Sequence, residues 1–355
     1  MNLEELRGKI DEVDAKIVRL IAERIRIAEE IGEEKQKQGK LIEDTKREQI
    51  VLENVRGVAR EEKLDHEDIE SIYRQIMIVT KNVEGLAVAF QGEIGAYSEE
   101  AAFQFFGPLT QVKPCESLED VFRAVEQGET QFGIIPIENS LEGSISRSYD
   151  LLLDSKLRVY GETELRIVHC LIANPETNLD FIKRVYSHPQ ALGQCQSFLR
   201  HLDCELIPTY DTAGSVKMIK EKGITDGAAI ASTRAAEIYR MHVLAREIED
   251  NPNNFTKFFI LAKRDSPPSG NDKTSIVFAV KHKPGALYEF LKELSARGIN
   301  LTKIESRPTR QKPWEYNFYL DFDGHHEDKI TQETLERLEE ISIFIRVLGS
   351  YPRAK

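Results

Sequence analysis

The chain has 355 residues, of which 41% are hydrophobic and 30% are charged. This length favours two or three domains, and the composition is typical of globular proteins. The formal net charge of −12 argues against nucleic acid as a partner, because phosphate binding needs a basic surface. No apolar run is long enough for a signal peptide or a membrane span, and the four cysteines lack CxxC spacing. We therefore expect a cytoplasmic protein with reduced thiols, no metal and no membrane partner.

Residues 1–84 are expected to be helical throughout. Apolar residues from Leu3 to Ile31 recur at steps of three and four, which predicts a long amphipathic helix ending near Gln38. Two shorter helices are expected over 44–62 and 65–84. A helix of roughly 50 Å cannot bury its whole apolar seam within its own chain. The pattern therefore favours an intertwined homodimer.

Basic residues interrupt or border this apolar seam. Arg24 stands where the pattern demands an apolar side chain, and Lys35 lies on the same helical face. Arg7 and Arg47 border the apolar stripes of the first and second helices. A charge on a buried seam is costly unless it is paired, so the set predicts a pocket for a small dianion. Polar residues that only set the helix register are the alternative.

The segment 1–84 resembles the all-helical chorismate mutases. The resemblance implies that chorismate rearranges to prephenate by a concerted step, assisted by groups that hold the substrate and stabilise developing charge. Lys35 and Glu84 would act on the ether oxygen, and Arg7 would come from the partner subunit. Many family members have glutamine in place of Glu84, and a carboxyl group donates a hydrogen bond only when protonated. The expected chorismate-binding residues are Arg7, Arg24, Lys35, Asp44, Arg47, Glu48, Thr80 and Glu84.

Residues 86–262 change to an α/β pattern. Short apolar runs rich in β-branched residues alternate with helical stretches, which predicts mostly parallel sheets. Several strand ends run directly into helix caps, as at Ser98, Ser117 and Thr212. Such turns collect backbone N–H groups that bind anions, although each cap by itself is an ordinary structural feature.

Five motifs in this segment, taken in order, resemble prephenate dehydratase: GEIGAYSEEAA, PIENSLEGSI, YSHPQALGQC, DTAGS and NFTKFFIL. The resemblance implies a two-lobed α/β fold similar to periplasmic binding proteins, which converts prephenate to phenylpyruvate with loss of carbon dioxide and hydroxide. It assigns the catalytic hydroxyl to Thr256, which precedes Lys257 where the family has arginine. The expected prephenate-binding residues are Asn139, Ser140, Ser187, His188, Gln190, Thr256 and Lys257.

Residues 263–273 have the composition of a linker between independent cores. Residues 274–355 then predict the order βαββαβ of a ferredoxin-like α+β unit. The segments KPGAL and ESRP resemble motifs of the ACT regulatory domain in phenylalanine-sensitive dehydratases. The resemblance implies that L-phenylalanine is bound by Gly285, Ala286, Leu287, Glu305, Ser306 and Arg307. A ferredoxin-like module used only for dimerisation is the alternative.

Together the segments predict a multidomain, bifunctional enzyme of phenylalanine biosynthesis. It would use no cofactor, form a homodimer or larger homo-oligomer, and respond to phenylalanine as an inhibitor. One alternative is a monofunctional prephenate dehydratase whose helical segment mainly dimerises. Another is a non-catalytic amino-acid sensor built on a binding-protein fold. Assays of chorismate loss and phenylpyruvate formation separate these hypotheses.

Overall fold

The computed structural model describes residues 2–37, 45–83, 86–309 and 315–354. The chain divides into two compact units. The first, here called the helical unit, comprises residues 1–87 together with 106–111. The second, here called the α/β unit, comprises residues 88–105 and 112–355.

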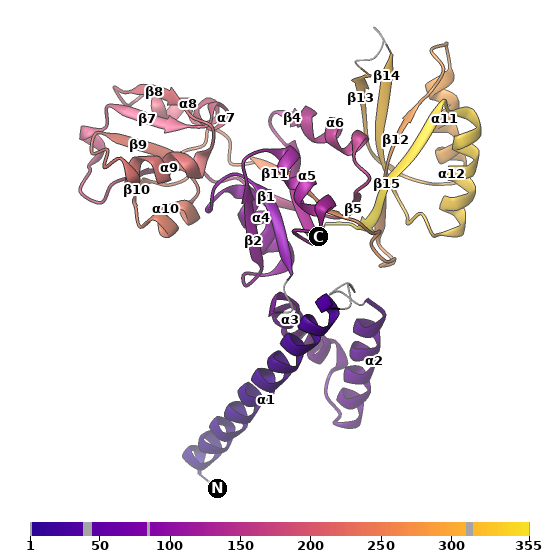
Figure 1. Ribbon diagram of the computed structural model, residues 1–355, viewed down its shortest axis with the longest axis horizontal. Helices are drawn as coiled ribbons and strands as arrows, with labels where there is room; N and C mark the ends of the chain where they lie inside the picture. The colour runs from indigo at the N-terminus through magenta and orange to yellow at the C-terminus, as the bar shows by residue number, and fades with distance from the viewer. Residues whose placement is uncertain (1, 38–44, 84–85, 310–314, 355) are drawn as a thin grey trace. The chain divides into compact units, whose positions relative to one another are not determined.

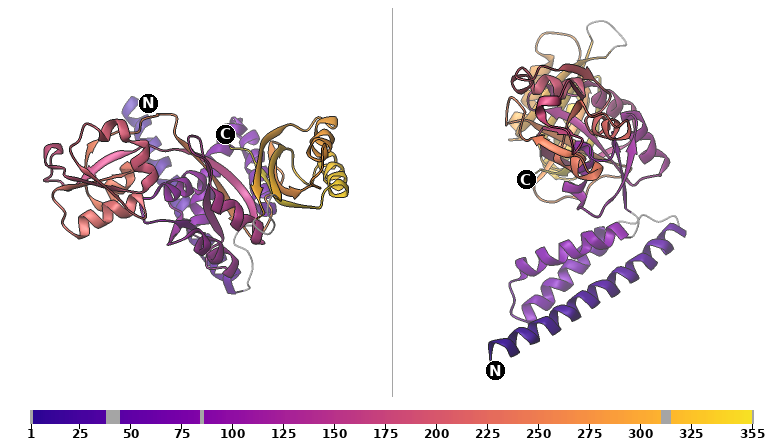
Figure 2. Two further views of the ribbon diagram at one scale, coloured as in Figure 1. Left: turned by 90° about the horizontal axis from the view of Figure 1, so that it is seen from above. Right: turned by 90° about the vertical axis from the view of Figure 1, so that its left-hand side faces the viewer.

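Three helices form the helical unit, as the sequence predicts: α1 (Leu3–Lys37), α2 (Thr45–Glu61) and α3 (His66–Val83). Helix α3 contacts both α1 and α2 (Figure 2). The small buried core includes Ala28, Leu52 and Met77. In contrast, the apolar seam at the start of α1 is exposed, with Ile10 at 60% and Leu20 at 64% of their full accessible area. The described helices of one chain therefore leave this seam uncovered.

The α/β unit contains a two-lobed region. The first lobe has a sheet in the order β2-β1-β3-β11-β5, with β4 paired to β3. Its elements are β1 (Ala87–Gln91), α4 (Tyr97–Phe106), β2 (Gln111–Cys115), α5 (Leu118–Gln127), β3 (Phe132–Asn139), β4 (Gly143–Ser144), α6 (Ser146–Asp154), β5 (Arg158–Arg166) and β11 (Phe255–Ala262).

The second lobe has a five-stranded sheet in the order β10-β6-β9-β7-β8. Its strands are β6 (Cys170–Ala173), β7 (Arg184–Ser187), β8 (Glu205–Pro208), β9 (Gly227–Ala231) and β10 (His242–Ala245). Its helices are η1 (Leu179–Phe181), α7 (Pro189–Gln194), α8 (Gln196–Leu199), α9 (Thr212–Glu221) and α10 (Thr233–Tyr239).

Both sheets are mixed, so the expectation of mostly parallel sheets is wrong. In the first lobe β1 and β3 are parallel, but β11 pairs antiparallel with both β3 and β5. The second lobe likewise combines parallel pairs at β7 with antiparallel pairs at β6. The chain leaves the first lobe after β5 and returns in β11, so these two adjacent strands run in opposite directions. The two crossover segments, 167–169 and 246–254, connect the lobes.

The C-terminal part has the predicted order βαββαβ, with an antiparallel sheet ordered β13-β14-β12-β15. Helices α11 and α12 cover one face of this sheet (Figure 1). Between sheet and helix, the rings of Phe278 and Phe290 stack with centroids 3.6 Å apart. The elements are β12 (Asp272–Ala279), α11 (Ala286–Ala296), β13 (Leu301–Pro308), β14 (Tyr316–Asp323), α12 (Lys329–Ile341) and β15 (Phe344–Pro352).

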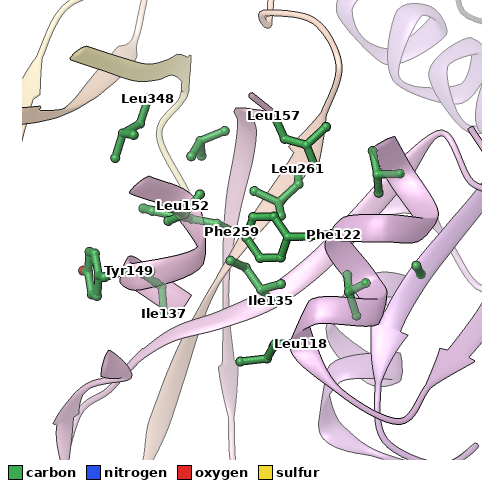
Figure 3. Close-up of a cluster of buried hydrophobic side chains, with 14 of the residues drawn as sticks. Leu118, Phe122, Ile135, Ile137, Tyr149, Leu152, Leu157, Phe259, Leu261 and Leu348 are labelled. Carbon is green, nitrogen blue, oxygen red and sulfur yellow. The ribbon is translucent and has the colours of Figure 1, made fainter. Parts of the chain in front are cut away.

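The opposite face of this C-terminal sheet shares a core with the first lobe. Tyr319, Leu348 and Tyr351 belong to the same buried cluster as Tyr149 and Phe259 (Figure 3). A buried ion pair joins the same two parts, with Lys273 Nζ 2.7 Å from Glu162 Oε2. The expectation of independent cores on either side of segment 263–273 is therefore wrong. That segment has the composition of a linker, but Lys273 at its end already belongs to the buried strand β12.

Candidate functional site

The helical unit pairs the half-buried cation of Arg24 with a hydroxyl group. The guanidinium of Arg24 donates to the hydroxyl of Thr80, which in turn donates to the carbonyl of Ile76 at 2.7 Å. The guanidinium also lies 5.8 Å from the centroid of the Tyr73 ring. Thr80 is 4% exposed. Two residues of the expected chorismate set, Arg24 and Thr80, are therefore brought together across α1 and α3.

Of the other residues in that set, the structure describes the side chains of Arg7 and Arg47. Arg7 lies on an exposed stretch of α1, about 26 Å along the helix from Arg24. Arg47 is exposed on α2. Asp44 and Glu84 lie outside the described residues, and Lys35 and Glu48 belong to α1 and α2 with side chains outside the description.

Thr256 lies at the start of β11, just after a crossover segment, and is 8% exposed. Its hydroxyl oxygen is 3.0 Å from Asn139 Nδ2, at the end of the neighbouring strand β3. The same Asn139 nitrogen is 2.7 Å from Asn254 Oδ1. Both asparagines are almost fully buried. The first lobe and the crossover thus hold Thr256 in a buried, hydrogen-bonded polar cluster.

This cluster extends into the second lobe through Gln194. Its Oε1 accepts from Asn254 Nδ2 at 2.9 Å and lies 3.0 Å from His169 Nε2. The other ring nitrogen of His169 is 2.9 Å from the Tyr97 hydroxyl. Burial lowers the pKa of His169 below its usual value. His169 is therefore held neutral near pH 7, and the cluster links helix α4, both crossover segments and α7.

The remaining expected prephenate ligands have different surroundings. The Ser140 hydroxyl bridges the Asn253 carbonyl and the Phe255 N–H. Ser187 is fully buried and donates to the Ile230 carbonyl at 2.6 Å. His188 caps α7 by accepting from the N–H of Gln190 at 3.3 Å. Of these three side chains, only His188 lines the cavity between the lobes.

Lys257 is separated from Thr256, because neighbouring residues of a strand point to opposite faces. Its ammonium group lies 3.2 Å from Glu164 Oε1 on β5. Burial opposes its charge, but Glu162 and Glu164 raise its pKa above the usual value. Its placement therefore does not support the expected role as a prephenate ligand.

A cavity of about 580 Å³ opens between the two lobes. The first lobe contributes the segments 91–98 and 114–116, and the second contributes His188 and residues 210–212. Tyr97 belongs to both the cavity wall and the polar cluster around Thr256. The described lining includes Glu93, Glu116 and Asp211 but no lysine or arginine. A substrate dianion would thus meet hydroxyl, amide and backbone donors in the described wall rather than cations.

The expected phenylalanine-binding residues divide into two groups. Gly285 has a left-handed φ of 81° and directly precedes α11 as its N-cap, while Ala286 and Leu287 line a cavity of about 500 Å³. Glu305 and Arg307 instead face the first lobe. Glu305 accepts from the Ser144 hydroxyl, and Arg307 donates to Ser146 Oγ at 2.7 Å. Ser306, between them on β13, is exposed.

Comparison with known families accounts for all three parts of the chain. The chorismate mutase type II profile matches residues 6–85, the prephenate dehydratase profile matches 88–266, and the ACT domain profile matches 274–340. The bifunctional chorismate mutase/prephenate dehydratase of Aquifex aeolicus is 39% identical over 364 residues, covering 99% of this chain and 98% of that protein. The chain belongs to the bifunctional chorismate mutase/prephenate dehydratase family.

Other relatives of this family agree. A Pseudomonas aeruginosa protein of the same name is 36% identical, and 99% of this chain and 98% of that protein are covered. The solved prephenate dehydratase of Arthrobacter aurescens in complex with L-Phe is 33% identical with a TM-score of 0.70, covering 76% of this chain and 90% of that one. No helix in the described part of the chain is long and apolar enough to cross a membrane.

Sequence reasoning missed four members of the polar cluster: Tyr97, which lies within the motif GEIGAYSEEAA, and Asn254, Gln194 and His169. Asn254 and Gln194 stand at the edges of motifs that were noted, NFTKFFIL and YSHPQALGQC. His169 precedes the apolar run CLIA and has no local signal of its own. A polar residue that borders such a run can mark a buried crossover, but only the fold brings these residues together.

Proposed function

We propose that the chain converts chorismate to prephenate in the helical unit and prephenate to phenylpyruvate in the two-lobed region, with L-phenylalanine as an inhibitor. Membership of a family whose relatives match this chain over nearly its full length supports both activities. The four free cysteines suit a reducing compartment, which supports the proposed cytoplasmic location.

The observation that carries the dehydratase proposal is the buried Thr256 hydroxyl, which Asn139 holds at the start of β11 beside the crossover segment. Aromatisation of the ring supplies the driving force of this reaction, so the enzyme mainly needs to assist departure of hydroxide. A hydroxyl group fixed in a cleft with little water can donate a hydrogen bond to the leaving oxygen. Thr256→Ala should remove most phenylpyruvate formation and leave chorismate consumption intact. Near wild-type phenylpyruvate formation by this variant would refute the role of Thr256.

For the mutase, we place Arg24 and Thr80 at the substrate carboxylates, with Arg7 supplied by a partner subunit. The exposed seam of α1 supports an intertwined dimer, because burying such an apolar stripe stabilises helix association. Arg7 is also too far along α1 to reach Arg24 of the same chain. Lys35 and Glu84 remain the predicted donors to the ether oxygen, with Arg47, Glu48 and Asp44 as further ligands.

Subunit complementation tests this shared site. Arg7→Ala and Arg24→Ala proteins should each lack mutase activity. A mixed dimer would contain one site with both arginines intact, so unfolding and refolding the two together should restore about one quarter of wild-type activity. Refolding each variant alone is the control. No recovery from a mixture that sedimentation shows to be dimeric would refute the shared site.

For regulation, we place L-phenylalanine beside Gly285, Ala286 and Leu287, where the start of α11 borders a cavity. Glu305, Ser306 and Arg307 would respond through β13, which contacts the first lobe through the side chains of Lys303, Glu305 and Arg307. Calorimetry should detect phenylalanine binding that Gly285→Val weakens. Binding that is absent, or unaffected by this substitution, would refute the placement.

A further inference from the structure

The side-chain amide of Asn139 has a fixed orientation. Its Oδ1 lies 3.1 Å from the backbone N of Leu141 and 3.2 Å from that of Glu142. Backbone N–H groups can only donate, so the atom that they face must be the amide oxygen. The other atom, which faces Asn254 and Thr256, must therefore be the NH₂ nitrogen.

No hydrogen-bonding capacity of this amide is left for a ligand. Its oxygen accepts from two backbone groups, and its nitrogen has three acceptors for two hydrogens: Asn254 Oδ1 at 2.7 Å, Thr256 Oγ1 at 3.0 Å and the Phe255 carbonyl at 3.1 Å. Asn139 is also only 3% exposed. Its geometry suits a positioning residue and not a substrate ligand.

The orientation of Asn139 limits the direction of the Thr256 hydrogen. An amide nitrogen is a donor and does not accept, so Thr256 cannot donate to Asn139. Among the hydrogen bonds of the described residues, Thr256 Oγ1 takes part only as the acceptor from Asn139. A side chain that is more than nine-tenths buried therefore keeps an unused donor, which is costly unless a ligand accepts it.

We propose that Asn139 is a positioning residue that makes Thr256 an obligatory hydrogen-bond donor to the substrate. This rests on the proposed dehydratase function and deepens it. When prephenate reacts, the ring C–O bond breaks and the oxygen leaves with its electron pair as hydroxide. The bond to the departing carbon dioxide supplies the electron pair that completes the aromatic ring, and hydroxide then takes a proton from solvent. The Thr256 O–H stabilises the leaving oxygen.

The hydrogen bonds of Asn139 belong to a closed ring of three side-chain amides and Glu142, which takes part with its carboxylate and its backbone N–H. Because Asn254 Oδ1 accepts from Asn139, its Nδ2 donates to Gln194 Oε1 at 2.9 Å. Gln194 Nε2 then donates to Glu142 Oε1 at 3.2 Å, and the N–H of Glu142 donates to Asn139. His169 Nε2 lies 3.0 Å from the same Gln194 oxygen, so it carries a hydrogen. The oxygen and nitrogen positions of every side-chain amide in the ring are therefore fixed. This keeps the Asn139 nitrogen facing Thr256, so that Thr256 can act as a donor only toward another group.

Asn139→Asp tests the proposal, because the carboxylate has the same shape but can only accept. It would draw the Thr256 hydrogen toward itself and away from the substrate. We expect kcat for phenylpyruvate formation at about pH 8 to fall at least about 100-fold, as for removal of one donor to a developing anion, with KM within about threefold. Activity should recover in part as the pH is lowered, because a protonated carboxyl group can donate again.

Three further variants distinguish a change in the direction of the Thr256 hydrogen bond from general damage to the fold. Thr256→Val lacks the donor and sets the lower limit of activity. Asn254→Asp loses the donor to Gln194 but still presents an acceptor where Asn139 donates, so Thr256 keeps its donor direction. Its loss in kcat should therefore be at least about tenfold smaller than that of Asn139→Asp. Asn174→Asp makes the same chemical change at an amide that contacts the Ile224 carbonyl in the second lobe, and it should keep wild-type kcat. Circular dichroism checks that each protein is folded.

Several results would overturn the inference. They are a kcat for Asn139→Asp within about threefold of wild type, a rise in KM alone, or an equal loss in Asn254→Asp. If Asn139→Asp does not fold, Asn139→Ala replaces it and should lower kcat without raising KM; the reverse would refute positioning. Failure of the wild-type protein to form phenylpyruvate would instead refute the proposed function.

Discussion

Removing the charge of Lys273 should destabilise the α/β unit strongly. The Lys273 side chain is 5% exposed and that of Glu162 is 2% exposed, and the two charges lie 2.7 Å apart. Glu162 also accepts from the backbone N–H of Ala354 at 3.1 Å, near the C-terminus. Lys273→Met leaves Glu162 buried without its cation. Breaking a buried ion pair in this way costs about 3–5 kcal/mol.

A second carboxyl group adds to this cost. Burial raises the pKa of Asp321, and the nearby Lys273 opposes that rise. Loss of the ammonium group removes the favourable interaction with Asp321 as well as with Glu162. We therefore expect Lys273→Met to lie toward the upper end of the 3–5 kcal/mol range cited above.

Urea unfolding at fixed protein concentration measures the effect, followed both by circular dichroism and by phenylpyruvate formation. Lys273→Met should lower the urea midpoint by both probes, because the C-terminal sheet and the first lobe share one core. The double variant Lys273→Met/Glu162→Gln should recover most of the loss. Lys292→Met is the matched control. Its pair with Glu289 is exposed, so the change should cost less than about 1 kcal/mol.

Two outcomes would refute this reasoning. A loss below about 1 kcal/mol for Lys273→Met would mean that the pair is solvated like a surface pair. In the second outcome, part of the secondary structure of Lys273→Met unfolds at a lower urea concentration, but the urea midpoint for loss of phenylpyruvate formation stays at the wild-type value. The C-terminal sheet would then be a separate folding unit.

The other predictions concern packing, pH and the mutase. Gly349→Ala should lower the free energy of unfolding by about 3 kcal/mol in urea titrations, because a Cβ there would collide with the Val159 carbonyl; a wild-type midpoint would contradict this. Burial lowers the pKa of His169, so the unfolded state binds a proton below about pH 6.5 that the folded state does not, and stability should fall as pH decreases. His169→Gln should reduce that fall between about pH 7 and pH 5, and an unchanged slope would exclude His169 as its cause. Mutase kcat/KM should fall as pH rises if Glu84 must donate a hydrogen bond, and Glu84→Gln should flatten the profile; equal profiles for the two proteins would contradict the alignment of that residue.

The fold was predictable wherever a single period dominates the sequence. The heptad seam from Leu3 to Ile31 gave α1 to within a residue of its end, and the βαββαβ order came from alternating short patterns. The periodicity of apolar residues could not show which element packs against each buried face. The run TSIVFAV contained a signal that was not used, because a continuous apolar strand indicates burial on both faces. All of β12 is indeed buried, with helices on one face and the first lobe on the other.

The candidate site was predictable only in part. Thr256 could be found because it belongs to a contiguous motif. Asn139 was expected to bind substrate, but the backbone N–H groups that saturate its oxygen come from a turn geometry that no residue pattern specifies. Lys257 was assigned because it stands where the family motif has arginine, although strand alternation points adjacent side chains to opposite faces. The alternation of side chains along a strand could therefore have predicted from the sequence that Lys257 and Thr256 point to opposite faces.

The most direct test of the central claim is a single time course in which the purified full-length chain is supplied with chorismate as the only substrate. Chorismate, prephenate and phenylpyruvate are separated and measured together. The account predicts that chorismate disappears and phenylpyruvate accumulates with no added enzyme, and that added L-phenylalanine slows the second step. Accumulation of prephenate without phenylpyruvate, or persistence of chorismate in a preparation that consumes added prephenate, would contradict the assignment of two activities to this chain.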